Sequence, residues 1–499
     1  MKNKILFWIF TDLFYFGMAK FFQSPENDLY AIYDVTNSSK KFLQNQEIVQ
    51  FTKSWYYHDN IDKNIDVDID YLKSFEKKYS INLWLLAYNE RIFFKYNYFY
   101  KFSKNEILSI LEQECKLFEK ILDEVTPDYL IMPSPNFHHD YLFYRMCKIK
   151  KINVLIFNYS RFGKRAIITN DLDKIVTHQL KDYSQPQRTQ QELLDYLKGF
   201  DYFKNNLDFA SNFMSSKTQL IKAIFHYIFF SNNNNNIYTY YGRTKTKVLL
   251  KTGILTLKEK YLEKIVQKYF VKDIDEKSKF IYFPLQVEPE NSLLIGSPFL
   301  TNQLELIKNI SKSLPIDYDL YVKEHPMMST RGWRNPSFYK KILELPNVRL
   351  LHPLVQNEKI LQNCSAVITI SSTAGMEAAF YGKSTIVFVD VLYSMLSSVH
   401  RLSNMDLLPE TISSILNEKV DFSDVNRFVN FIDDNSINFD LFGFLTKLTN
   451  HFFYNGFLQD VTITEQDMLS FLDQHKQEFE FLVSEHIKKF NPSEKLVKE

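Results

Sequence analysis

The chain has 499 residues, of which 45% are apolar and 24% charged, and its formal net charge at pH 7 is +1. This length and apolar content favour a globular protein of two to four domains. The balanced charge gives no overall attraction to nucleic acid. No apolar run is long enough to span a bilayer, because Asp12, Lys20 or Lys222 interrupts each of the longest candidates.

The first 178 residues form a series of short β-rich runs that alternate with polar or helical segments. We expect strands at 4–10, 29–35, 47–52, 81–87, 128–134 and 153–160, and a long helix at 103–125. This alternation predicts an α/β domain. At the strand ends, Asp12, His138 and His139 are candidates for a catalytic base, although each residue type is also common at a helix start.

Two further features of the chain concern its compartment. The N-terminal run MKNKILFWIFTDLF has the apolar character of a secretion signal, but it lacks a small-residue cleavage site and continues as a domain strand. Cys115, Cys147 and Cys364 lie too far apart for a metal-binding clip and suit a reducing compartment. We therefore expect a cytoplasmic protein with no bound metal and no cofactor.

Residues 179–277 are polar and poor in β pattern, which predicts a helical insert with a flexible loop at the asparagine run 232–236. Between Arg243 and Lys272 there are nine basic residues and two acidic ones. With the neighbouring apolar stretch, this makes 219–272 a candidate contact with an anionic membrane surface. A solvated helix face is the commoner explanation of such a charge pattern.

Residues 278–419 show a second series of strands and helices. We expect strands at 279–286, 320–325, 348–353, 366–371 and 384–389, with helices at 300–313, 335–345, 356–363 and 373–381. Regular alternation of this kind predicts a parallel sheet with right-handed crossovers, whose ligands bind outside the carboxyl ends of the strands. Residues 420–499 are helical in pattern and are expected to fold back across both domains.

The strongest functional signal is the segment AVITISSTAGMEAAFYGK at 366–383, where a strand ends in Ser371, Ser372 and Thr373 and a small-residue helix begins. Hydroxyl groups, unpaired backbone N–H groups and the positive end of the helix dipole make this an anion site suited to phosphate. Glu377 lies about one helical turn further on, where it would hold a sugar hydroxyl. A capped strand-to-helix turn without a ligand is the alternative.

Other polar residues follow neighbouring strands of the same series. Lys323, His325 and Pro326 end the strand before a loop with Arg331 and Arg334, and a charged lysine suits a phosphate. The loop after the first strand of this half adds three more candidates for the same crevice. These are Gln286, Glu288 and Glu290.

The C-terminal half resembles the bacterial capsule polysaccharide biosynthesis family. The motifs that carry the resemblance are YFPLQVEPE at 282–290, KEHP at 323–326, NVRLLHP at 347–353 and ISSTAGMEAAFYGK at 370–383. That family is similar to the CMP-sugar transferases for Kdo and sialic acid, which have a GT-B fold of two facing Rossmann-like domains. The resemblance implies that a His-Pro pair and a Ser-Ser pair contact the cytidine nucleotide and its phosphate, and these are His325–Pro326 and Ser371–Ser372 here.

The resemblance further implies a metal-independent glycosyltransferase that moves a Kdo- or sialic-acid-like sugar from a CMP donor to a surface glycan or its lipid-linked precursor. Lys323, Thr373 and Glu377 would complete the donor site, and the enzyme would act in the cytoplasm or at the inner face of the plasma membrane. Whether the reaction inverts or retains the anomeric configuration of the sugar is open, and Glu288 and Glu290 are the candidate nucleophiles for a retaining reaction. A CDP-polyol phosphotransferase of the teichoic-acid type, a UDP-sugar 2-epimerase and a non-catalytic capsule-assembly subunit are the alternatives.

Overall fold

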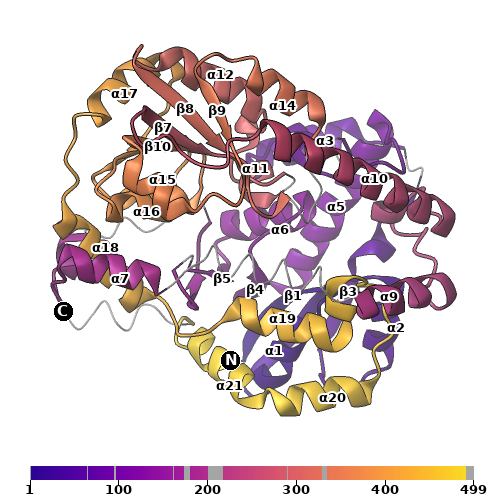
Figure 1. Cartoon of the computed structure of the whole chain (residues 1–499). Helices are drawn as coiled ribbons and strands as arrows, with labels where there is room; N and C mark the ends of the chain where they lie inside the picture. The colour runs from indigo at the N-terminus through magenta and orange to yellow at the C-terminus, as the bar shows by residue number, and fades with distance from the viewer. Residues whose placement is uncertain are drawn as a thin grey trace.

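The chain folds into two α/β domains with helices on both faces of each sheet (Figure 1). The computed structural model describes residues 2–63, 66–94, 97–160, 162–172, 180–199, 217–288, 290–328 and 334–490. Arg331, a sequence candidate for the cleft, lies outside the described residues.

The N-terminal sheet has the strand order β3-β2-β1-β4-β5-β6. Its strands are β1 (Asn3–Phe10), β2 (Asn27–Asp34), β3 (Lys53–Tyr56), β4 (Tyr129–Pro133), β5 (Asn153–Tyr159) and β6 (Ala166–Thr169). All neighbours pair in parallel except β5 and β6. The helices of this half are α1 (Phe14–Phe22), α2 (Asn37–Asn45), α3 (Ile69–Tyr79), α4 (Leu83–Asn89), α5 (Lys104–Val125) and α6 (His138–Ile149).

Side chains of the central strand β1 alternate between two apolar layers, as the period of two in a strand requires. Phe7 and Ile9 pack with α1 and the C-terminal helices, whereas Leu6 and Trp8 pack with α3, α5 and α6. All four side chains are fully buried, so the sheet is covered on both faces.

The C-terminal sheet has the order β12-β11-β10-β7-β8-β9 and is parallel throughout. Its strands are β7 (Lys279–Pro284), β8 (Tyr318–Lys323), β9 (Val348–Leu351), β10 (Ala366–Thr369), β11 (Thr385–Val387) and β12 (Val399–Arg401). Its helices are α11 (Asn291–Leu294), α12 (Gln303–Ser313), α14 (Pro336–Leu343), α15 (Asn357–Asn363), α16 (Thr373–Phe380) and α17 (Leu408–Ile415). In both sheets the chain winds outward from the first strand in the order of a Rossmann fold, which confirms the predicted pair of Rossmann-like domains.

Helices outside the two sheets connect the domains. The insert contributes α7 (Gln190–Lys198), α9 (Lys217–Phe229) and α10 (Lys245–Tyr269), and the C-terminal segment α18 (Phe422–Asn435), α19 (Leu441–Phe452), α20 (Glu465–Gln474) and α21 (Lys476–Ile487). Helix α18 packs beside α16 and α7, and α19 to α21 then cover the α1 face of the N-terminal sheet. The C-terminal segment therefore folds back across both domains, as expected from the sequence.

Two of the expected strands are wrong. The run at 81–87 forms the helix α4 instead, because Asn82 caps it by accepting a hydrogen bond from the Leu85 N–H (2.8 Å) and leucine and alanine favour a helix. The third strand begins at Lys53 rather than 47, and the buried side chains of Ile48 and Val49 belong to the loop before it. The sequence pattern also missed β6 and β12, which are only four and three residues long.

The asparagine run 232–236 is an ordered contact and not the flexible loop expected. The Asn234 side chain is buried, donates to Asp460 Oδ2 (2.9 Å) and accepts from the Asn37 N–H (3.0 Å). The run therefore ties the insert to the start of α2 and to the C-terminal segment.

Among the described helices, none has the length and apolar character needed to cross a bilayer.

Candidate functional site

The carboxyl ends of β7, β8 and β10 lie side by side in the C-terminal sheet, and the polar residues predicted from the sequence follow them. Gln286, after β7, donates to Thr369 Oγ1 (3.4 Å) and accepts from Ser371 Oγ (3.5 Å). Thr369 Oγ1 in turn accepts from the Ser372 N–H (3.0 Å). These contacts fix the turn that leads from β10 into α16.

Ser372 is the N-cap of α16, and its hydroxyl accepts a hydrogen bond from the Ala374 N–H (3.3 Å). Thr373 starts the helix and is partly exposed, like Ser372, whereas Ser371 is buried. The N-terminus of α16 is thus accessible at the sheet edge, which is the geometry for binding an anion through the helix dipole.

Gly375 allows α16 to lie close against the sheet. A Cβ atom at this position would lie 2.8 Å from the Tyr393 hydroxyl and 2.9 Å from Thr385 Cγ2. The Tyr393 hydroxyl uses this space to donate to the Ser372 carbonyl. Gly375 therefore lets the neighbouring strand and the loop that carries Tyr393 approach α16 closely.

Lys323 and Glu377 interact electrostatically on the face of the sheet that α15 and α16 cover. Lys323 is only 3% exposed and donates to Asn357 Oδ1 at the start of α15. Burial lowers the pKa of Lys323 to about 7, and the nearby Glu377 carboxylate opposes this shift. The residues that the sequence assigned to phosphate and to a sugar hydroxyl, Lys323 and Glu377, therefore lie in the same region of the domain.

Arg334 takes a different position from the open cleft expected for it. Its side chain is 3% exposed and forms ion pairs with Glu324 Oε2 (2.9 Å) and Glu288 Oε1 (2.6 Å). The Tyr339 hydroxyl also donates to Glu324 (2.7 Å), and Arg334 donates to the Gln286 carbonyl. Arg334 therefore holds the loops after β7 and β8 together. Because the Glu288 carboxylate is paired with Arg334, it is poorly placed to act as a nucleophile.

His325 and Pro326 lie in the loop after β8 and are partly exposed. The Nδ1 atom of His325 accepts a hydrogen bond from the Met327 N–H (3.2 Å), which orients the ring. Glu290 is partly exposed just before α11, and the neighbouring Asn291 donates to the Pro135 carbonyl of the N-terminal domain (3.0 Å). The loop after β7 is thus in direct contact with the facing domain.

In the N-terminal domain, Asp12 follows β1 and accepts a hydrogen bond from the Phe14 N–H (3.0 Å) at the start of α1. Burial raises the pKa of Asp12, and that backbone hydrogen bond lowers it by less. A carboxylate with a raised pKa at the carboxyl end of a central strand has the character of a general base.

His138 and His139 are almost fully buried, and His138 also contributes to the wall of the small cavity described below. His138 faces Glu90 through Nδ1 (2.8 Å) and Glu114 through Nε2 (3.0 Å), and His139 Nε2 faces Asp34 (2.8 Å). Burial lowers the pKa of His138, but the two carboxylates outweigh it and raise the pKa to about 10. Glu114, His138 and His139 offer ligand atoms within 4.8 Å of one another. Both ring nitrogens of His138 face carboxylates, which favours the protonated form of the ring.

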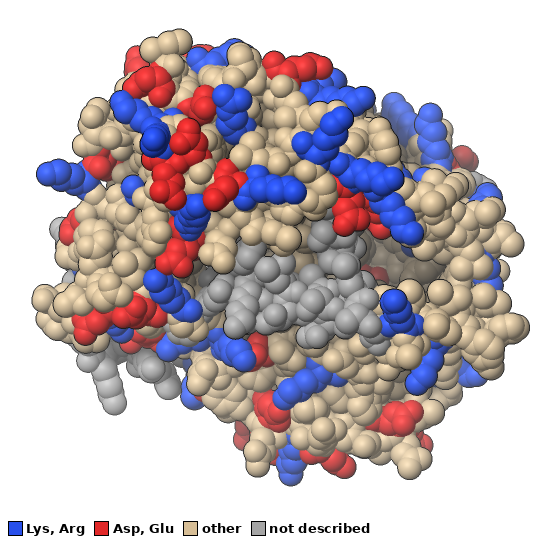
Figure 2. Space-filling model, in the orientation of Figure 1, with Lys and Arg blue, Asp and Glu red and all other residues tan. Residues whose placement is uncertain are grey.

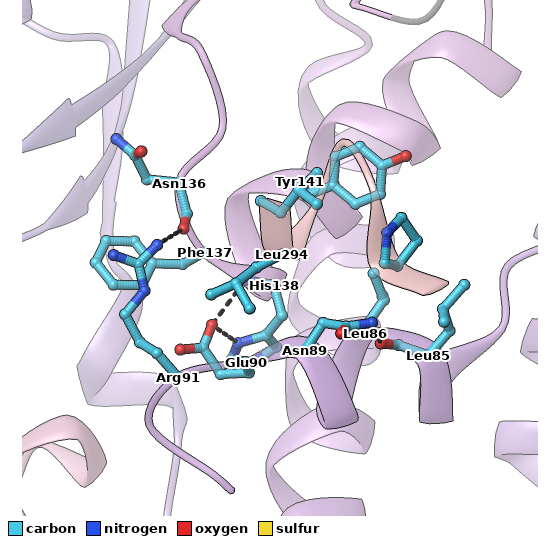
Figure 3. A pocket seen from close by; sticks show the side chains of 12 residues that line it. Leu85, Leu86, Asn89, Glu90, Arg91, Asn136, Phe137, His138, Tyr141 and Leu294 are labelled. Carbon is cyan, nitrogen blue, oxygen red and sulfur yellow. Dashed lines mark hydrogen bonds and ion pairs between the residues drawn. The ribbon is translucent and has the colours of Figure 1, made fainter. Parts of the chain in front are cut away.

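A small cavity of about 60 Å³ lies between the two domains (Figure 3). Leu85, Leu86 and Tyr141 line it from the N-terminal domain, and Leu294 and Pro298 from the C-terminal domain. It is much smaller than the roughly 300 Å³ typical of small-molecule sites, so it is not the nucleotide site. Most of the cavity wall is apolar, but Glu90, Arg91 and two residues that follow β4, Asn136 and His138, also line it.

The sequence missed several residues that shape these sites. Asn357 and Gln303 hold Lys323 and the Gln286 backbone, and Glu90 and Arg91 form the wall of the cavity. Of these residues, only Asn357 could have been found from the sequence, because it is a polar residue at the start of the helix that follows the expected strand 348–353. Gln303 and Glu90 act through contacts with residues distant in sequence, which a single sequence does not reveal.

Comparison with known proteins adds a family to this geometry. Residues 178–398 match the sequence model described as capsule polysaccharide biosynthesis protein. Protein FixF of Sinorhizobium fredii (strain NBRC 101917 / NGR234) is 28% identical over 140 residues, which make up 27% of this chain and 32% of FixF. The match thus spans about a third of that relative's length.

Two solved structures show weak similarity to this chain. KpsC of Thermosulfurimonas dismutans, a beta Kdo 2,7 transferase, is 14% identical with a TM-score of 0.30 and covers 63% of this chain and 79% of its own. UDP-GlcNAc 2-epimerase of Methanocaldococcus jannaschii is 13% identical with a TM-score of 0.23 and covers 87% and 100%. Similarity this weak extends to a transferase and an epimerase alike and favours neither activity.

Proposed function

We propose that this chain, whose residues 178–398 belong to the capsule polysaccharide biosynthesis family, is a glycosyltransferase that uses a CMP-activated sugar of the Kdo or sialic acid type. The observation that carries the proposal is the shared position of Lys323, Glu377 and the start of α16 at the carboxyl ends of β8 and β10. A basic group, a carboxylate and a helix N-terminus at one sheet edge suit the phosphate and ribose of a nucleotide.

In this role the C-terminal domain holds the donor. Ser372, Thr373 and the first N–H groups of α16 bind the phosphate, and Lys323 and His325 supply positive charge and a further donor. Negative charge builds on the departing CMP in the transition state, where one well-placed hydrogen-bond donor is worth about 3 kcal/mol. Glu377 holds a hydroxyl of the ribose or sugar, and Pro326 fixes the loop that carries His325. In this role Lys323, His325 and the dipole of α16 stabilise the charge on the phosphate, a task for which other transferases use a metal ion.

The N-terminal domain binds the acceptor, which is a surface glycan or its lipid-linked precursor. Asp12 is the preferred base, because it lies at the carboxyl end of the central strand β1 and burial raises its pKa, which makes the carboxylate a stronger base than an ordinary aspartate. Glu288 is tied to Arg334, which disfavours a covalent intermediate on this carboxylate and so favours direct displacement. The enzyme acts in the cytoplasm at the inner face of the plasma membrane.

Release of CMP tests this proposal against its rivals. The purified chain is incubated with CMP-Kdo or CMP-sialic acid, with and without a mixture of capsule glycans, and free CMP is measured. We expect release that depends on the acceptor and is lost in Asp12→Asn. Conversion of UDP-GlcNAc without an acceptor would instead identify an epimerase, and transfer of polyol phosphate from a CDP donor would identify a teichoic-acid-type enzyme. Glycan binding without turnover of any donor would leave a non-catalytic assembly subunit.

A further inference from the structure

Helix α9 exposes a continuous apolar face. Its exposed apolar side chains occur as adjacent pairs that repeat every four residues, which places them on one face of the helix. Ala223 is the one buried residue of this helix. They are Leu220, Ile221, Ile224, Phe225, Ile228 and Phe229. Ile221 and Phe229 are 66% and 65% exposed, far above what a helix packed on a core retains. Scattered exposed apolar residues are normal, but an aligned stripe of six is not.

The first two-thirds of α10 present a second stripe of the same kind. Leu250, Ile254, Leu257 and Tyr261 follow each other at spacings of four, three and four residues and are 56% to 69% exposed. The buried residues of this helix, Leu262, Ile265 and Val266, all lie near its end. A Cβ on Gly253 would meet nothing within 4 Å, so this part of α10 stands clear of the described protein.

A third group of apolar side chains comes from α4 and the segment after it. Trp84, Tyr88, Phe94 and Tyr98 are 38% to 65% exposed, and the rings of Tyr88 and Phe94 lie 5.4 Å apart. Lys251 of α10 stacks over the Tyr98 ring at 4.3 Å, and Lys245 donates to the Ile228 carbonyl of α9 (2.7 Å). These two lysines join all three groups into one surface.

Lysines flank the apolar stripe of α10, whereas its two acidic residues, Glu259 and Glu263, lie on the opposite side of the helix. On α10, viewed along its axis, Lys247, Lys251 and Lys258 lie on one side of the apolar stripe and Lys260 on the other. The flank that carries α9 and the start of α10 is mostly tan in Figure 2, with lysine and arginine side chains at its margin. Apolar stripes with flanking lysines, and tryptophan and tyrosine at the edge, match the layers of a bilayer surface with anionic headgroups.

We propose that α9, the first two-thirds of α10 and the exposed side chains of Trp84, Tyr88, Phe94 and Tyr98 form one docking surface for an anionic lipid bilayer. Phe225, Phe229 and Leu250 enter the acyl layer, and the flanking lysines contact lipid phosphates. A second copy of this chain is the competing occupant, but the lysine fringe would then face a like-charged fringe, which opposes association.

The surface also leads to the crevice between the domains. Helix α4 carries Trp84 and Tyr88 on the docking surface, while Leu85 and Leu86 of the same helix line the apolar cavity (Figure 3). Resting on the proposed glycosyl transfer, this arrangement assigns the acceptor to the lipid-linked class, since a glycan held on a bilayer lipid would meet the cavity beside its anchor.

Flotation of the full chain with vesicles tests the docking surface without using any activity. Vesicles of phosphatidylglycerol and phosphatidylcholine in equal parts are compared with pure phosphatidylcholine, at low and high salt. We expect flotation with the anionic vesicles only, about tenfold weaker in the double variant Phe225→Glu/Phe229→Glu and in Lys247→Glu/Lys258→Glu. The matched control is Ile316→Glu, which places the same charge at a fully exposed apolar residue of the other domain. It should float like the wild type.

A second readout places α4 at the bilayer. Acyl chains of brominated phosphatidylcholine, mixed into the anionic vesicles, should quench tryptophan fluorescence, and Trp84→Phe should lose most of this quenching while still floating. Absence of flotation at low salt would overturn the proposal, as would a wild-type dimer in light scattering that Phe225→Glu/Phe229→Glu converts to a monomer without any vesicle binding. Nucleotide binding by the same variants keeps the two proposals separate, because loss of docking leaves the donor site of the other domain intact.

Discussion

Replacing Arg334 with methionine is expected to lower the free energy of unfolding of the C-terminal domain by about 3–5 kcal/mol. The guanidinium lies between Glu324, whose side chain is fully buried, and Glu288, whose side chain is 15% exposed. Methionine fills most of the volume but leaves two buried carboxylates without a cation, and burial of an unpaired charge is costly. The loops after β7 and β8, which these carboxylates hold, should loosen at the same time.

Urea unfolding followed by circular dichroism measures this effect, and the midpoint should fall by about 2 M given the slope typical of such domains. Lys279→Met is the matched control, because Lys279 pairs with Asp317 (2.7 Å) on the exposed surface of the same domain. Its midpoint should not change. A wild-type-like midpoint for Arg334→Met would show that the network contributes little and that the geometry described for these loops is wrong.

Affinity for nucleotide is expected to fall by up to about tenfold per pH unit between pH 7 and pH 9. Lys323 has a pKa of about 7 in the folded chain, so above this pH most molecules carry a neutral amine at the phosphate site. Binding of a phosphate favours the ammonium form and therefore takes up a proton. The nucleotide itself adds no such dependence, since its phosphate is already a dianion above pH 7.

The free energy of unfolding of the nucleotide-free chain should instead rise with pH over this range. Below pH 7 Lys323 is charged in both the folded and unfolded chain, and the folded state bears the full cost of burying it. Between pH 7 and 10.5 the unfolded chain still binds the proton and the folded chain does not, so the contribution of Lys323 to the free energy of unfolding rises with pH.

The prediction for nucleotide binding is tested by calorimetry in buffers of different ionisation enthalpy, which counts the protons taken up on binding. Lys323→Met should bind weakly at every pH, whereas Lys308→Met, on the exposed face of α12, should keep the wild-type profile. An unchanged affinity across this pH range would remove Lys323 from the phosphate site.

The fold was largely predictable because its signals are local. Strands β1, β2, β4, β5 and β7 to β11 are short β-rich runs that end in polar residues, and α16 begins at a serine cap that the sequence displays directly. The error at α4 arose because the run 81–87, with six apolar residues and Asn82, fits a strand and a buried helix equally well. The Asn82 cap and packing against α6 favour the helix, and packing is not local.

The position of the proposed donor-site residues was more predictable than that of the candidates in the N-terminal domain, for the same reason. Ser371, Ser372, Lys323 and Glu377 sit at strand ends or one helical turn beyond, so the order of strands brings them together. His138 and Arg334 also follow strands or loops, yet their partners Glu90, Glu114 and Glu324 turn them into buried ion pairs. Whether a polar side chain faces a ligand or a partner depends on contacts across the fold, which the sequence pattern does not contain.

The most direct test of the central claim is calorimetric titration of the purified chain with CMP, CDP, UDP and GDP, repeated with His325→Ala and Ser372→Ala. The site at the ends of β8 and β10 should bind CMP more tightly than the other nucleotides and should lose that binding in both variants. Preference for UDP or CDP, or CMP binding that survives both substitutions, would contradict a CMP-sugar site at these strand ends.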